Sequence, residues 1–154
     1  MQATKETFKA VAGEAYDILD RYIVIHNEVF RTSIRNVIPI PGLFKPIDYG
    51  SYDEELFTLQ DELQKVGSVI SEFSVSSAAR SSEREFLSVL TGYVRALERA
   101  VTQLWAICSR LDGKSRGDRK YGWGEFRRDK EIYDLAVSVY RSVGEKLNAA
   151  YRNL

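Results

Sequence analysis

Apolar side chains recur along most of this chain at alternating steps of three and four residues. Residues with that spacing lie along one side of an α-helix, so each such stretch predicts an amphipathic helix. The first stretch runs from about Thr4 to Asn36, and its apolar line consists of Phe8, Val11, Ala15, Ile18, Tyr22, Ile25 and Val29. No stretch shows the sustained alternation typical of a half-buried β-strand, and the sequence therefore predicts an all-helical fold.

Two further helices are marked by their start signals. Ser51 with Glu54, and Ser82 with Glu85, have the spacing of a capping box, in which side chains satisfy backbone N–H groups of the first turn. Apolar residues then repeat at heptad spacing in both segments: Leu56, Leu59, Leu63, Val66, Ile70 and Phe73 in the first, and Phe86, Leu90, Tyr93, Leu97, Ala100, Leu104, Ile107 and Leu111 in the second. Gly113 is well placed to end the second of these helices.

The last predicted helix runs from about Asp129 to the C-terminus and carries two apolar lines side by side. One line is predicted to face the core: Ile132, Ala136, Val139, Val143, Leu147 and Ala150. The other consists of Tyr133, Val137, Tyr140, Gly144 and Tyr151. Two lines exceed what one core contact needs, and tyrosine is enriched at protein interfaces. We therefore predict self-association, with Tyr133, Tyr140 and Tyr151 at the oligomer interface.

Four long helices in a chain of 154 residues are typical of a single helical-bundle domain, here spanning 1–154. The connections alternate in length, because 37–50 and 113–128 are long whereas 76–81 is short. In an up-down-up-down bundle the first and third connections lie at the same end. The sequence thus predicts an all-α four-helix bundle with its two long loops at one end.

The two long loops differ in their chemistry. The first contains Pro39, Pro41 and Pro46 among apolar residues, and we expect a stiff strap that packs over the bundle end, against the second loop. The second interleaves basic and aromatic residues, as stacking on bases combined with phosphate contact would need. Its candidate ligand-binding or partner-binding residues are Lys120, Tyr121, Trp123, Arg127 and Arg128. In the alternative interpretation the loop is structural, its aromatic residues hold it in place, and its basic groups are compensated by Asp118, Glu125 and Asp129.

Charge and cysteine content narrow the classes of protein. The chain has 22 basic and 22 acidic residues, unlike a protein that coats nucleic acid or a membrane surface, so nucleic acid is kept only as an alternative partner. Cys108 is the only cysteine, and no disulfide can form within the chain. The first residues lack the basic and apolar regions of a signal peptide, and no apolar run reaches the length of a membrane span. We expect a soluble cytoplasmic protein with no membrane contact.

Few side chains are suited to catalysis or metal binding. His26 is the only histidine and lies on the apolar side of the first helix, so we expect it to be at least half buried, hydrogen-bonded and without a metal. The segment from Arg21 to His26 has the Arg-x4-His spacing of HEPN ribonucleases, which are also small helical domains. This resemblance covers six residues and implies RNA cleavage. On a regular helix, residues five apart point about 140° away from each other.

These observations favour a non-catalytic bundle that acts through association with itself or with a partner protein. We expect no catalytic residues, no cofactor and no metal, because the chain shows no nucleophile paired with a base and no cluster of metal ligands. Two alternatives stay open. One is the binding of nucleic acid or another anionic ligand by the loop 113–128, and the other is a HEPN-like ribonuclease.

Overall fold

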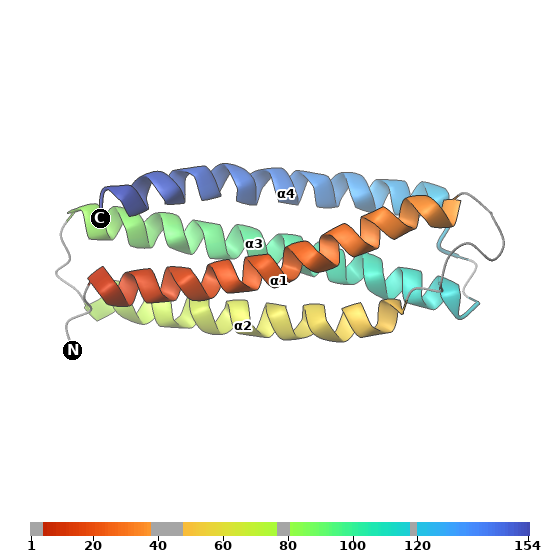
Figure 1. Ribbon diagram of the computed structural model, residues 1–154, viewed down its shortest axis with the longest axis horizontal. Helices are drawn as coiled ribbons and strands as arrows, with labels where there is room; N and C mark the ends of the chain where they lie inside the picture. The colour runs from red at the N-terminus through yellow and green to blue at the C-terminus, as the bar shows by residue number, and fades with distance from the viewer. Residues whose placement is uncertain (1–4, 38–47, 77–80, 118–119) are drawn as a thin grey trace.

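The structure is a computed structural model that describes residues 5–37, 48–76, 81–117 and 120–154, with side chains described outside 31–37 and 74–76. It contains four α-helices: α1 (Lys5–Val37), α2 (Tyr49–Ser76), α3 (Ser81–Ser115) and α4 (Trp123–Arg152). The helices run alternately up and down, and each packs against the next one along the chain (Figure 1). The predicted all-α four-helix bundle is confirmed.

The helix ends joined by the two expected long connections lie at one end of the bundle. Figure 1 shows the last turns of α1 and α3 and the first turns of α2 and α4 together there. The helix ends that flank the first and third connections therefore lie at the same end, as predicted. The proline-rich strap falls on 38–47, outside the described residues, so its packing against the second loop stays a prediction.

The core is formed by the apolar lines that heptad spacing predicts for α1, α2 and α3. α3 lies against both α2 and α4 and is the most completely buried helix among those described. Its buried residues are Phe86, Leu87, Leu90, Tyr93, Val94, Ala96, Leu97, Ala100, Val101, Leu104, Ile107 and Cys108. Each fully buried leucine-sized side chain contributes about 1.5–3 kcal/mol of transfer free energy. Burial also raises the pKa of the Cys108 thiol to about 12, which makes it an unreactive core residue.

The predicted loop 113–128 is helical at both of its ends, which corrects the sequence-based boundaries. α3 continues past Gly113 to Ser115, and Gly117 with φ +108° follows the helix end, as a left-handed C-terminal cap requires. α4 begins at Trp123, six residues before the predicted start at Asp129. The Glu125 carboxylate accepts a hydrogen bond from the Gly122 N–H at 3.1 Å. This start could not be predicted from the sequence, because the N-cap residue is a glycine and has no side chain to accept a hydrogen bond.

Leu147 and Ala150 of the predicted core line of α4 are buried, but in the first half of the helix a different line faces the core. Tyr133 and Tyr140 are buried in the core, whereas Ile132 is 49% exposed and Val139 is 42% exposed. The tyrosine rings are long enough to reach α1, and the Tyr140 ring lies edge-on to that of Tyr22, with 5.9 Å between centroids. Burial within one chain removes Tyr133 and Tyr140 from the surface on which the predicted interface would need them. Tyr151 alone of the three remains partly exposed.

Candidate functional site

The predicted ligand-binding residues lie just before α4 and in its first turns, and one of them, Tyr121, is part of the packing between helices. Tyr121 is buried, and its hydroxyl donates a hydrogen bond to Oδ2 of Asp129 at 2.8 Å. Asp129 also forms an ion pair with Arg110 of α3. Burial raises the pKa of Tyr121, and the hydrogen bond to Asp129 raises it further, so the phenol stays neutral. Tyr121 therefore fastens the start of α4 to α3, and its ring is not available for stacking on a ligand.

The other candidates in this segment stay on the surface. Lys120, Arg127 and Arg128 are exposed, and Trp123 is 58% exposed with its ring 5.7 Å from that of Phe126. Arg127 lies 3.8 Å from Glu131, one turn further along α4. Acidic groups from Glu125 to Glu131 are thus interleaved with the basic ones, as the structural interpretation of this segment expects. Asp118, which that interpretation also invoked, lies outside the described residues.

A hydrogen-bonded cluster of aromatic side chains lies inside the bundle between α1 and α4. The Tyr133 hydroxyl is hydrogen-bonded both to the Tyr22 hydroxyl and to Nδ1 of His26, the latter at 2.5 Å. Burial lowers the pKa of His26, and the positive charge of Arg141 lowers it further, so the imidazole is neutral at pH 7. This arrangement explains the partly buried position of His26 by packing and hydrogen bonding.

The Arg-x4-His spacing does not bring its two side chains together. Arg21 points to α2, where its guanidinium Nη1 lies 2.7 Å from Oε2 of Glu62. His26 points to α4 and Tyr133. The two side chains contact different helices, as the angle between positions five apart on a helix requires. The geometry expected of paired RNA-cleaving residues is therefore missing from this pair.

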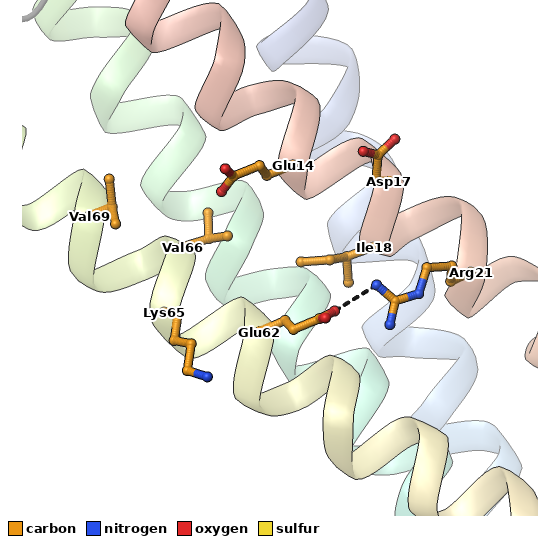
Figure 2. A pocket seen from close by; sticks show the side chains of 8 residues that line it. All are labelled: Glu14, Asp17, Ile18, Arg21, Glu62, Lys65, Val66 and Val69. Carbon is orange, nitrogen blue, oxygen red and sulfur yellow. Dashed lines mark hydrogen bonds and ion pairs between the residues drawn. The ribbon is translucent and has the colours of Figure 1, made fainter.

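A groove of about 300 Å³ lies between α1 and α2 (Figure 2). Its apolar base includes Ile18 and Val66, and the ion pair of Arg21 with Glu62 bridges the two helices beside it. The complete lining is Glu14, Asp17, Ile18, Arg21, Glu62, Lys65, Val66 and Val69. These eight residues include no histidine, cysteine or hydroxyl side chain.

The outer face of α4 carries apolar side chains that the core does not use. Ile132, Leu135 and Val139 are 49%, 67% and 42% exposed. They are three and four residues apart and therefore lie within about 60° of one another around the helix. Sequence analysis missed this face because it assigned Ile132 and Val139 to the core and gave Leu135 no role. The available signal was Leu135, an apolar residue next to Ile132 and Val139 that neither predicted line uses.

No protein-family model, curated protein or solved structure matches this chain. Within the described ranges, no helix has the length and apolar character needed to cross a membrane. The same ranges hold no group of three or more histidine, cysteine, aspartate or glutamate residues that could bind a metal ion.

Proposed function

We propose that this protein is a non-catalytic helical bundle that acts by association, with the outer face of α4 as its contact surface. The observation that carries the proposal is the exposure of Ile132, Leu135 and Val139 on one face of one helix. Exposed apolar side chains scattered singly are ordinary on protein surfaces, whereas a contiguous group is typical of an interaction site. Among the described residues, eight large apolar side chains are exposed, and three of them form this group.

The packing of α4 supports this assignment. The inward side of the helix is already occupied, because Tyr133, Val137, Tyr140 and Leu147 are buried against the other helices. Replacing Leu135 by a polar residue would cost the isolated bundle little, since a side chain 67% exposed contributes little core packing. An apolar residue in that position therefore has its main benefit in a complex.

The test compares two chains with matched surface changes. Leu135→Glu places a charge on the proposed contact face, and Val24→Glu does the same at a position on α1 that is 56% exposed. Light scattering over a concentration series measures self-association, and affinity capture from an extract of the producing cells measures binding of other proteins. We expect Leu135→Glu to abolish whichever association the wild-type chain shows, and Val24→Glu to leave it intact. Association that is absent in the wild type, or equally sensitive to both changes, contradicts the proposal.

A second candidate function is the binding of an anionic ligand or nucleic acid at the start of α4. It is favoured by one observation, the surface exposure of Trp123 with the exposed Arg127 one turn further along α4. An exposed indole next to cations suits stacking on a base with phosphate contact. The test is titration with a single-stranded oligonucleotide, monitored by tryptophan fluorescence. Arg127→Ala combined with Arg128→Ala should abolish binding while thermal stability stays nearly unchanged, and a loss of stability instead would make these arginines structural.

A further inference from the structure

The outer face of α4 has a pattern of charge and apolarity that complements itself when read in the opposite direction. Residues seven apart on a helix are two turns apart and lie on nearly the same line. Four exposed residues occupy such a line, in the order Glu125, Ile132, Val139 and Lys146. The line therefore has an acidic residue at one end, an apolar middle and a basic residue at the other end, and the exposed Arg128 lies one turn from Glu125 on the same face. Leu135, the most exposed of the three apolar residues, lies beside the middle of the line.

This order of side chains selects one arrangement of two α4 helices. If a second copy lies antiparallel, with a two-fold axis beside Leu135, then Ile132 of each copy meets Val139 of the other. The same register places Glu125 of each copy opposite Lys146 of the other. In a parallel arrangement Glu125 would meet Glu125 and Lys146 would meet Lys146, and like charges across an interface are destabilising. The antiparallel pairing satisfies the apolar and the charged positions together.

We propose that the occupant of the outer face of α4 is a second copy of this chain, packed antiparallel in a two-fold symmetric dimer. The inference rests on the proposed function and specifies its partner. An interface of this symmetry uses the same patch on both copies, which a self-complementary line provides. α4 runs along one margin of the bundle, as a helix that meets a second bundle must (Figure 1). Because three apolar side chains per copy make a small contact, the dimer dissociates on dilution.

Cysteine cross-linking tests the arrangement directly. The native Cys108 is fully buried, so it does not compete for oxidation. Leu135→Cys places a thiol beside the two-fold axis, where two helices about 8–10 Å apart bring the Cα atoms within reach of a disulfide. Ser142→Cys is the matched control, because an antiparallel dimer separates its two copies by about 13 residues, or about 20 Å. Mixing a chain carrying Arg128→Cys with one carrying Ser142→Cys should restore cross-linking, since these positions face each other across the axis.

The expected result is a disulfide-linked dimer for Leu135→Cys and for the mixed pair, and none for Ser142→Cys alone. Efficient cross-linking of Ser142→Cys with itself would overturn the antiparallel arrangement. Charge reversal gives an independent readout, because Lys146→Glu should weaken dimerisation about tenfold. Adding Glu125→Lys to that chain restores opposite charges across the axis and should recover the affinity, even though the hydrogen bond from the Gly122 N–H to Glu125 is lost.

The outcome also separates this inference from the proposed function. A wild-type chain that is monomeric at every concentration overturns the dimer. If such a chain nevertheless captures another protein, and Leu135→Glu abolishes that capture, the proposed function stands with a different occupant. If the chain neither dimerises nor captures any protein through Leu135, both fail.

Discussion

Tyr133 is the residue on which the contact between α1 and α4 depends most. Its side chain is fully buried, and its hydroxyl is shared between Tyr22 and His26. The Phe30 ring stacks on the Tyr133 ring with 5.2 Å between centroids. Removing a buried hydroxyl leaves its hydrogen-bond partners unpaired. Each unpaired partner still carries its desolvation cost but no longer has the compensating bond.

Replacing Tyr133 by phenylalanine should therefore lower the free energy of unfolding by about 1–3 kcal/mol. The change keeps the ring and removes only the hydroxyl, which leaves Tyr22 and His26 without that partner. Tyr16→Phe is the control, since its hydroxyl donates to Asn148 at 3.1 Å in an exposed position and should cost less than about 1 kcal/mol. Urea unfolding followed by circular dichroism measures both, and equal effects would contradict the role given to the buried cluster.

His26 should give the bundle a pH dependence in the range where no other side chain ordinarily titrates. Its pKa is lowered from the ordinary 6.5 by burial first and by Arg141 second, so near and below pH 6.5 the unfolded chain binds more protons than the folded one. Stability must therefore fall as the pH drops below about 6.5. Lys130 lowers the pKa further, while Asp134 opposes the shift.

The measurement is the free energy of unfolding between pH 7.5 and pH 5.5 for the wild type and for His26→Gln. The glutamine keeps a hydrogen-bonding group near Tyr133 but cannot titrate. The wild type should lose stability across this range, whereas the variant should change much less. Parallel curves for the two chains would show that the pH dependence comes from other groups.

At the level of elements, the number and order of helices could be predicted from the sequence, whereas the orientation of the first half of α4 could not. α1, α2 and α3 each have one dominant apolar line, and burial follows that line. α4 has two apolar lines, with Leu135 next to the first, and hydrophobicity alone does not rank the two lines. The choice is made by packing, because only the line with Tyr133 and Tyr140 offers rings that reach the hydroxyl and imidazole groups of α1.

The predictions of where α3 ends and α4 begins were wrong for a related reason. Gly113 and Asp129 are each residue types typical of helix ends, so the sequence predicts a stop at the first and a start at the second. The structure instead ends α3 at Ser115, next to Gly117, and begins α4 after Gly122. As a consequence, fewer of the predicted ligand-binding residues are accessible to a ligand. Tyr121 became part of the packing between helices, while Trp123 and the two arginines moved onto the first turns of α4.

Two glycine substitutions should have opposite effects that report these boundaries. Gly117 has a φ of +108°, so Gly117→Ala is strained and should destabilise the protein by about 1–2 kcal/mol. Gly13 lies inside α1 with nothing within 4 Å of an added Cβ, so Gly13→Ala should stabilise by about 1 kcal/mol. Thermal unfolding of the two variants measures the signs. A neutral or stabilising Gly117→Ala would contradict the left-handed cap after α3.

At the scale of the whole molecule, the zero net charge conceals an uneven distribution. α2 contains six acidic residues and one basic residue, Lys65. In Figure 1 α2 and α4 form opposite margins of the bundle. A dimer built on α4 therefore holds the two acidic α2 helices far apart, on its outer sides. Since separated surface charges are screened beyond about 10 Å at 0.1 M salt, repulsion between them does not oppose dimerisation.

The charges that do matter for the dimer lie at the ends of the α4 line, and they predict a reversal of salt dependence. In the wild type Glu125 faces Lys146 of the partner copy, so added NaCl should weaken dimerisation by screening an attraction. In Lys146→Glu two carboxylates face each other, so added NaCl should strengthen dimerisation by screening a repulsion. Raising ionic strength from about 0.01 M to about 1 M shortens the screening length from about 30 Å to about 3 Å, which covers the whole effect.

Analytical ultracentrifugation of both chains at several salt concentrations measures the dissociation constants. The apolar contact at Ile132, Leu135 and Val139 is common to both chains, so any general effect of NaCl on hydrophobic association moves both curves in the same direction. Only the interaction between residues 125 and 146 changes sign between them. Slopes of opposite sign are therefore specific to the antiparallel register. Slopes of the same sign would mean that Glu125 and Lys146 do not meet, and the register would be wrong even if a dimer forms.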